Sequence, residues 1–156
     1  MSTTQFLEQL AGILPAERLL VRQEDLAPYE CDALTALREQ PLAVAIPETE
    51  SEILKLLEAC RQHSIAVVTR GAGTGLSGGA RPVAGALLVS MMRFTRILEV
   101  DEDNLTALVQ PGVRNLVISE TVADKGLYYA PDPSSQLACS IGGNVAENAG
   151  GVHCLK

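Results

Sequence analysis

The 156 residues are enough for one domain with a hydrophobic core, but too few for a cofactor domain together with a complete substrate domain. Apolar residues make up 47% of the chain and charged residues 20%, so burial of apolar surface can offset the lost chain entropy, which excludes disorder. The formal net charge is −7 and no basic cluster is present, so nucleic acid is not expected as a partner, because its recognition depends on clustered Lys and Arg.

The N-terminal stretch MSTTQFLEQLAG lacks the basic start and apolar core of a secretory signal. No apolar run approaches the roughly 20 residues that cross a bilayer, so we expect a cytoplasmic protein without a transmembrane segment. Peripheral attachment to the inner membrane through partner subunits would leave no mark in the composition and stays open. The four cysteines are far apart, without the close pairs of zinc sites or redox dithiols, which predicts reduced thiols in core or pocket positions and no metal site: Cys31, Cys60, Cys139 and Cys154.

Helical spacing of apolar residues opens the chain. After Ser2, Thr3 and Thr4, any of which could cap a helix, an amphipathic helix ending at Pro15 is predicted by Phe6, Leu7, Leu10, Ile13 and Leu14. Residues 17–40 have no decisive periodicity and are expected to form connecting structure, with a short strand at residues 19–21.

A strand, helix and strand follow over residues 42–69. Leu42–Ile46 and Ile65–Val68 are short apolar runs typical of buried strands, and such an α/β unit normally pairs them in parallel. Thr49 and Glu52 match the capping box that begins a helix. The apolar face of this helix is expected to comprise Ile53, Leu57 and Cys60.

Three further strands and one helix are expected after residue 80. The strands are predicted at residues 86–90, 96–100 and 105–109. The helix includes residues 116–122, with Lys125 in its last turn and Gly126 as the left-handed residue that ends it.

The segment RGAGTGLSGGA, Arg70–Ala80, directly follows a predicted strand and contains five glycines between Gly71 and Gly79. Each glycine costs about 0.5–1 kcal/mol of chain entropy relative to alanine. Hydrogen bonds from exposed amides to a pyrophosphate contribute about 1.5–3 kcal/mol each and could offset that cost. Thr74 and Ser77 add hydroxyl donors. A tight surface turn is the alternative, but the density of glycines favours the phosphate site.

A nicotinamide-binding Rossmann loop is a second alternative for this segment. Gly73, Gly75 and Gly78 fit its glycine pattern, and Glu99 lies where a ribose-binding acid is expected. A Rossmann loop must open a helix, however, and that helix is disfavoured here by Gly79, Pro82 and Gly85. The phosphate contacts are therefore expected from the amides of the loop itself.

A second glycine-rich segment, PDPSSQLACSIGGNVAENAGG, spans Pro131–Gly151. Its small side chains would let backbone amides approach a planar ligand, and Asn144 and Asn148 can donate or accept hydrogen bonds. A loop with polar caps is the alternative, because Gly and Asn are ordinary turn formers.

The two segments, in this order, closely resemble the FAD domain of the vanillyl-alcohol-oxidase type, also called the PCMH type. The resemblance is nearest to the FAD-binding subunit of bacterial glycolate oxidase and its D-lactate dehydrogenase relatives, and it covers about Pro41–Lys156. The PYECDA stretch at Pro28–Ala33 resembles the family more weakly. This implies an α+β fold with α/β subdomains, in which residues 1–40 form a helical arm and connector and residues 41–156 form the FAD domain, incomplete at its C-terminal end.

The resemblance also implies a function: oxidation of a 2-hydroxy acid, glycolate or D-lactate, to the 2-oxo acid by hydride transfer to FAD. A D-lactate or D-2-hydroxyglutarate dehydrogenase, a Rossmann protein and a non-catalytic module remain alternatives. Catalytic residues are unknown, because in this family they would lie downstream, so the 156-residue chain alone is expected to be inactive. Other glycolate oxidase subunits are possible partners.

By motif position, the resemblance implies that the first segment surrounds the pyrophosphate and the second flanks the ribityl chain and isoalloxazine. The implied cofactor-binding residues are Arg70, Gly71, Ala72, Gly73, Thr74, Gly75, Leu76, Ser77, Gly78, Pro131, Asp132, Pro133, Ser135, Ser140, Gly142, Gly143, Asn144, Ala146, Asn148 and Gly150. The first segment lacks the histidine that bonds covalently to the flavin in some members, so non-covalent FAD is expected. His63 is expected to be a solvated helix end and His153 to lie near the flavin segment, and neither is assigned as a base.

Overall fold

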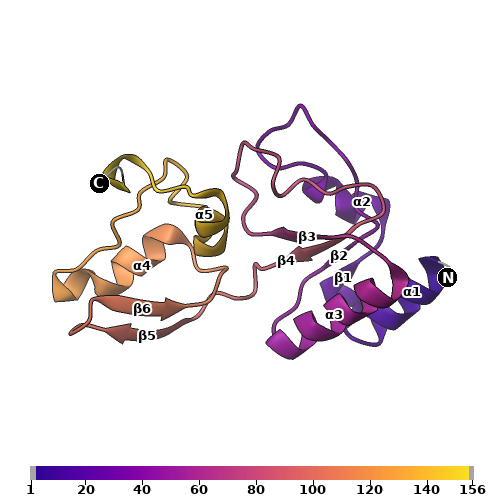
Figure 1. Ribbon diagram of the computed structural model, residues 1–156, viewed down its shortest axis with the longest axis horizontal. Coiled ribbons are helices and arrows are strands. Elements are labelled where there is room, and N and C mark those ends of the chain that lie inside the picture. The colour runs from indigo at the N-terminus through magenta and orange to yellow at the C-terminus, as the bar shows by residue number, and fades with distance from the viewer. Residues whose placement is uncertain (1–2, 155–156) are drawn as a thin grey trace. The chain divides into compact units, whose positions relative to one another are not determined.

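The computed structural model describes residues 3–154, which divide into two compact units (Figure 1). The first unit comprises the residues up to Arg70 together with Gly75–Arg93. The second comprises Gly71–Thr74 and the residues from Phe94 onward. The first glycine segment is therefore shared: Gly71–Thr74 belong to the second unit, whereas Arg70 and the residues from Gly75 onward belong to the first.

The first unit contains a four-stranded sheet in the order β1-β2-β4-β3, formed by β1 (Leu19–Leu20), β2 (Ala43–Ala45), β3 (Val67–Arg70) and β4 (Leu87–Ser90). β2 and β3 are both parallel to β4, and β1 is antiparallel to β2. The predicted direct pairing of the strands at 42–46 and 65–68 is wrong, because β4 lies between them. β4 is buried along its whole length whereas β3 is partly exposed, so the more apolar strand takes the central position.

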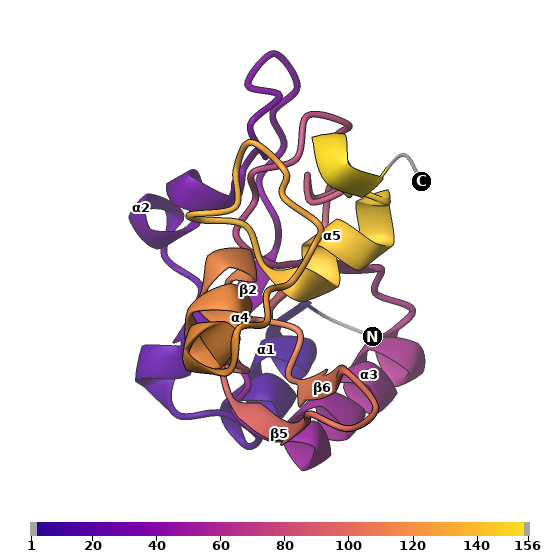
Figure 2. The ribbon, with the colours of Figure 1, turned by 90° about the vertical axis from the view of Figure 1, so that its left-hand side faces the viewer.

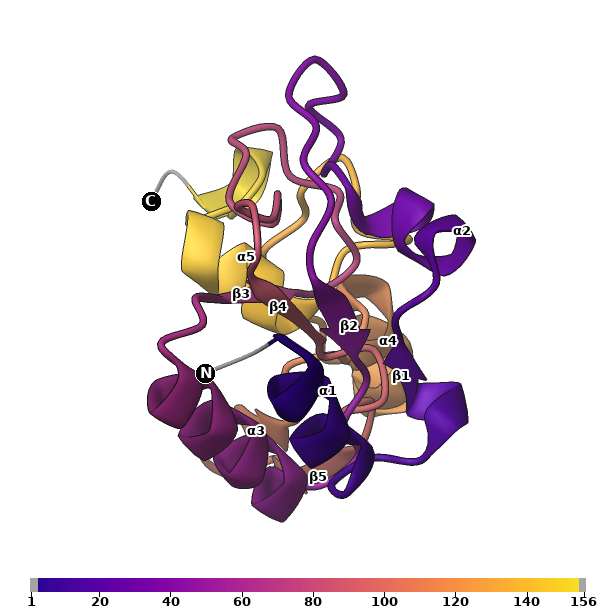
Figure 3. The ribbon, with the colours of Figure 1, turned by 90° about the vertical axis from the view of Figure 1, so that its right-hand side faces the viewer.

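Helices cover both faces of this sheet. α1 (Thr3–Ala11) and α3 (Glu50–His63) lie side by side on one face, where Phe6, Leu56 and Leu87 share a core (Figure 3). The other face is covered by α2 (Gln23–Leu26) and the 3₁₀ turn η2 (Ala27–Tyr29). Neighbouring strand residues therefore enter opposite cores, as the alternation of a β-strand requires.

Two details of the helices differ from prediction. α1 ends at Ala11 rather than Pro15, with Gly12 donating to the carbonyls of Glu8 and Gln9. In α3 the buried residues are Leu56, Ala59 and Cys60, so the predicted burial of Leu57, which is 43% exposed, is wrong. The adjacent leucines both fit helical spacing, and contacts with α1 and the sheet select Leu56.

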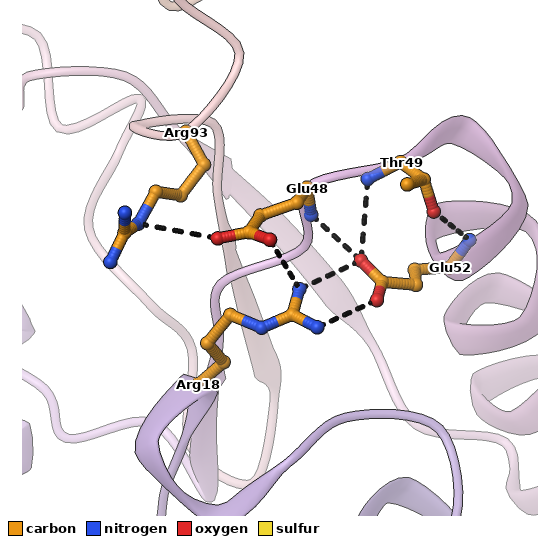
Figure 4. Close-up of polar contacts among 5 residues, drawn as sticks. All are labelled: Arg18, Glu48, Thr49, Glu52 and Arg93. Carbon is orange, nitrogen blue, oxygen red and sulfur yellow. Dashed lines mark hydrogen bonds and ion pairs between the residues drawn. The ribbon is translucent and has the colours of Figure 1, made fainter.

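The predicted capping box of α3 is confirmed and belongs to a larger ionic network (Figure 4). Thr49 Oγ1 accepts from the Glu52 amide at 3.2 Å, and Glu52 Oε2 accepts from the Thr49 amide at 3.2 Å. Arg18, at the end of the 3₁₀ turn η1 (Ala16–Arg18), donates to both Glu52 carboxylate oxygens at 2.8 and 2.9 Å. Glu48 lies 3.7 Å from Arg18 and from Arg93, so the network joins the segments that follow β2 and β4.

The second unit is built on the antiparallel hairpin of β5 (Ile97–Asp101) and β6 (Thr106–Val109), with α4 (Asn115–Val122) along it (Figures 1 and 2). The turn η3 (Ala123–Lys125) follows, and Gly126 has the predicted left-handed φ of 69°. Beyond it lie α5 (Ile141–Glu147), which is not predicted from the sequence, and η4 (Val152–Cys154). The core joins α4 and α5 through Val113, Ile118 and Ile141.

The remaining predictions concern single side chains. His63 is not a solvated helix end: its Nε2 lies 3.0 Å from Gln9 Oε1 and its ring 5.3 Å from that of Phe6. Cys31, Cys60 and Cys139 are free thiols as predicted, and burial raises the pKa of Cys60 to about 11. The side chain of Cys154 lies outside the described part of the chain. Among residues 3–154, no helix has the length and apolar character to span a bilayer.

Candidate functional site

The first glycine segment leaves the carboxyl end of β3, at the edge where the parallel strands β2, β4 and β3 all end. Ligands of open α/β sheets bind at this edge. No helix forms between Gly71 and Gly85, and the carbonyl of Gly78 accepts a turn bond from the Arg81 amide at 3.2 Å. The Rossmann alternative requires a helix from Gly78 onward, so it is wrong.

The backbone amides of this segment are free. No amide from Gly71 to Ala80 donates to an acceptor within residues 3–154. Backbone donors are almost always satisfied, so these amides must bind water or a ligand. Gly73 and Gly78 have φ values of 72° and 78°, where only glycine is unstrained. The sequence therefore provides a run of unpaired donors along a backbone path that glycine permits.

In the first unit, residues 29–33 contact this segment. Arg70 Nη1 donates to the Cys31 carbonyl at 2.7 Å, and the guanidinium carbon lies 5.7 Å from the centre of the Tyr29 ring. The Ala33 amide donates to the Gly75 carbonyl at 3.0 Å. Between them, Asp32 is 4% exposed, and its Oδ1 accepts from the Leu34 amide while its Oδ2 has no partner among the described residues.

In the second unit, the start of the glycine segment lies against α5. A Cβ built on Gly71 would lie 2.0 Å from Ser140 Oγ and 4.0 Å from the Gly143 amide nitrogen, so any other residue there would force Ser140 to move. Ser140 Oγ and Asn144 Nδ2 are buried without a hydrogen-bond partner in the described part of the chain. A ligand with acceptor groups would satisfy both, which fits a dinucleotide.

Several other predicted site residues have packing, capping or turn-forming roles in the fold. Gly142 packs against Pro111, where an added Cβ would lie 2.8 Å from the proline Cβ, and its amide donates to the Pro111 carbonyl at 2.9 Å. Asn148 is the left-handed C-cap of α5, with φ 54°. Ser135 accepts through its carbonyl from Ala138 and Cys139, which forms the turn before α5. The exposed positions are Ala72, Leu76, Ser77, Ala146 and Asn148.

The two ends of the second segment are held together by Asp132. Its amide donates to the Gly150 carbonyl at 3.0 Å, and it forms a parallel bridge with Gly151, whose φ is 75°. His153 Nδ1 lies 2.6 Å from Asp132 Oδ2. Burial opposes ionisation of Asp132, but hydrogen bonds from the His153 amide and ring outweigh it and lower the pKa of the carboxyl.

Asn115 is a positioning residue whose role the sequence pattern does not indicate. It is 1% exposed on α4, its amide donates to the Cys139 carbonyl at 3.0 Å, and its Nδ2 donates to the Pro131 carbonyl at 3.0 Å. It therefore fixes both sides of the loop between Pro131 and α5. The available signal is an asparagine directly before the apolar positions of a predicted helix.

Comparison with known proteins identifies the family. Residues 41–156 match the family described as the FAD binding domain. The chain belongs to this FAD-binding family. Over 153 residues it is 54% identical to the glycolate oxidase subunit GlcD of Escherichia coli (strain K12), covering 98% of this chain and 31% of that protein. It is 41% identical over 156 residues to the subunit of the same name from Bacillus subtilis (strain 168), covering 100% of this chain and 33% of that protein.

A D-2-hydroxyglutarate dehydrogenase of Xanthomonas citri pv. viticola is 34% identical over 147 residues, or 94% of this FAD-binding chain and 31% of that protein. The chain thus spans about a third of the length of these curated relatives.

Solved structures agree with the predicted fold class. An alkyldihydroxyacetonephosphate synthase superposes with a TM-score of 0.82 at 18% identity, over 94% of this chain and 29% of that chain. p-Cresol methylhydroxylase superposes with a TM-score of 0.70 at 22% identity, over 82% of this chain and 27% of that chain. The α+β fold of the PCMH type is confirmed. The predicted boundary at residue 40 and the individual FAD contacts stay predictions.

Proposed function

We propose that this FAD-binding chain belongs to a flavoprotein that oxidises a 2-hydroxy acid, glycolate or D-lactate, to the corresponding 2-oxo acid. The proposal is supported by the similarity to proteins named as glycolate oxidase subunits and, at 32% identity, to a D-lactate dehydrogenase of Anaerostipes hadrus. When bound, FAD would supply the acceptor for the hydride that leaves the hydroxy acid. Residues that contact the substrate are not assigned to this chain.

The unpaired amides from Gly71 to Ala80 carry the cofactor part of the proposal. These donors are suited to the oxygens of a diphosphate, and Thr74 and Ser77 add hydroxyls. Pro131–Ser135 and Ser140–Gly151 would flank the ribityl chain and the isoalloxazine, with Ser140 Oγ and Asn144 Nδ2 as available polar groups. The first segment has no histidine, which supports non-covalent FAD.

The full-length protein provides the test of cofactor binding. It is expected to purify with flavin absorbance, and acid precipitation is expected to release the FAD into the supernatant. Gly73→Ala should lose the flavin. Gly85→Ala is the matched control, because Gly85 has a similar φ of 73° with no atom near its Cβ position, and it should retain the flavin. Equal flavin content in the two variants would contradict the assignment of the segment.

Turnover tests the reaction. The flavin of the full-length protein should be reduced anaerobically by glycolate or D-lactate, with D-2-hydroxyglutarate as the alternative substrate suggested by the relatives of that name. A flavin that none of these acids reduces would contradict the proposed enzyme and favour a non-catalytic module.

Partner subunits are part of the same proposal. The similar proteins of Escherichia coli and Bacillus subtilis are named as subunits, which supports assembly of the whole protein with other polypeptides. We propose a cytoplasmic location with attachment to the inner membrane through those partners. Cell fractionation with and without the partner genes checks this, and membrane association that does not depend on them would contradict it.

A further inference from the structure

The side chain of Arg70 contacts residues that lie far before it in the chain, Tyr29 and Cys31. Arg70 ends β3 and begins the first glycine segment, where a cation could bind a diphosphate directly. Instead its Nη1 donates to the Cys31 carbonyl at 2.7 Å, and the Tyr29 ring lies beside the guanidinium with the centroid 5.7 Å from its carbon. One N–H and one face of the guanidinium are therefore already engaged within the first unit.

A second contact holds the glycine segment farther along. The Ala33 amide donates to the Gly75 carbonyl at 3.0 Å. Between Cys31 and Ala33, the buried Asp32 accepts from the Leu34 amide at 2.9 Å and fixes this turn. The Tyr29–Ala33 stretch thus contacts the glycine segment at Arg70 and again at Gly75, and these contacts involve one carbonyl and the arginine side chain but none of the free amides.

We infer that Arg70 is a positioning residue and that Tyr29–Ala33 is a brace that fixes the path of the first glycine segment. A glycine-rich segment loses much entropy when it is ordered, so a brace that orders it before the ligand arrives strengthens binding. The diphosphate is then held by the amides, and Arg70 acts through Tyr29 and Cys31 rather than through its charge. The inference rests on the proposed binding of FAD.

A double-mutant cycle on the full-length apoprotein separates the two roles. The dissociation constant for FAD is measured by flavin fluorescence for Tyr29→Leu, Arg70→Met and the double variant. A charged hydrogen bond and a cation–π contact predict increases of about tenfold for Arg70→Met and about threefold for Tyr29→Leu. Because both act on one brace, the double variant should lie within about twofold of Arg70→Met alone.

Conservative variants and a salt titration test whether Arg70 acts through its guanidinium contacts or through its charge. Tyr29→Phe keeps the ring face and should restore the affinity that Tyr29→Leu loses. Arg70→Lys keeps the charge but not the planar guanidinium, so it should rescue Arg70→Met poorly. The dependence of FAD affinity on salt concentration should be the same in wild type and Arg70→Met. If Arg70 instead contacted the phosphates with its charge, Arg70→Met would show a weaker salt dependence than wild type. Thermal denaturation of each apoprotein verifies that the variants fold.

The outcomes distinguish the inference from the function on which it rests. Additive effects of the two substitutions, full rescue by Arg70→Lys and a weaker salt dependence in Arg70→Met would overturn the positioning role while leaving FAD binding intact. A wild-type protein that binds no FAD would instead overturn the proposed function.

Discussion

Gly71 and Ser140 approach so closely that a Cβ on the glycine would lie 2.0 Å from the serine Oγ and 3.3 Å from the serine Cβ. Both residues belong to predicted FAD-binding segments, and they meet within the second unit. The contact places the start of the glycine segment beside the buried and unpartnered Ser140 Oγ. Glycine is needed here for the approach of two chain segments.

Gly71→Ala is expected to destabilise the full-length protein by about 1–3 kcal/mol, the usual effect of overpacking a buried site. Ser140→Ala removes the nearest atom but not the serine Cβ, so the double variant should recover part of this loss. Ser140→Ala alone should have a small effect, because its Oγ makes no hydrogen bond among the described residues. Urea denaturation measures the coupling, and strictly additive effects of the two substitutions would contradict the close contact.

Gly151 should tolerate substitution less well than Gly126, although both glycines have a left-handed φ. Its φ is 75°, and an added Cβ would lie 2.4 Å from the carbonyl carbon and oxygen of Asp132. Gly126 has φ 69° with no atom near its Cβ position. Gly126→Ala should therefore cost only the conformational term, about 1–2 kcal/mol, whereas Gly151→Ala should exceed it and break the bridge to Asp132. Equal losses in thermal denaturation would show that the bridge is not needed for stability.

Local signals explain which elements the sequence predicts. The capping box of α3 and the left-handed Gly126 depend on residues close in sequence, so both are found correctly. The central position of β4 depends on how all the strands pair with one another, and no local sequence pattern indicates that order. α5 contains Gly142 and Gly143 and has little intrinsic preference for helix, and bonds from its first amides to Val113 and Pro111 support its start.

The candidate site divides in the same way. The density of glycines in the first segment predicts unpaired amides without knowledge of the fold, and the structure has them. The bracing contacts of Tyr29–Ala33 and the bonds of Asn115 join residues far apart in sequence. A single sequence does not show which distant residues such side chains contact, and even for Asn115 it gives only the position before a predicted helix.

Asp32 presents one unpartnered carboxylate oxygen in a buried position. Asp32→Ala removes the acceptor for the Leu34 amide and should cost about 1–2 kcal/mol. Asp32→Asn keeps an amide oxygen that can accept from Leu34, and its NH₂ group replaces the unpartnered oxygen. The free energy of unfolding of this variant should therefore lie within about 1 kcal/mol of the wild-type value. Chemical denaturation compares the two variants. A loss in Asp32→Asn as large as in Asp32→Ala would mean that Oδ2 has a partner in solution.

Arg18 and Glu52 predict a pH dependence of stability. Hydrogen bonds from Arg18 lower the pKa of Glu52 from 4.5 to about 2. The amides of Glu48 and Thr49 also donate to this carboxylate, and together these bonds outweigh the opposing effect of burial. A lowered carboxyl pKa stabilises the folded state above the unfolded value, and this contribution is lost as the pH falls from 4.5 through about 2. Arg18→Met should therefore lower the midpoint of thermal unfolding by about 3–6 °C at neutral pH and have little effect near pH 2.

The exposed pair of Arg61 and Glu58 is the matched control for this network. Its hydrogen bonds also lower the pKa of Glu58 to about 2, but the arginine side chain is 75% exposed and the glutamate 47%, against 15% and 17% for Arg18 and Glu52. Solvent screens an exposed ion pair, so Arg61→Met should change the midpoint by no more than about 2 °C at any pH. If Arg61→Met and Arg18→Met lowered the midpoint of thermal unfolding equally at neutral pH, burial would not explain the stabilising effect of the Arg18 network.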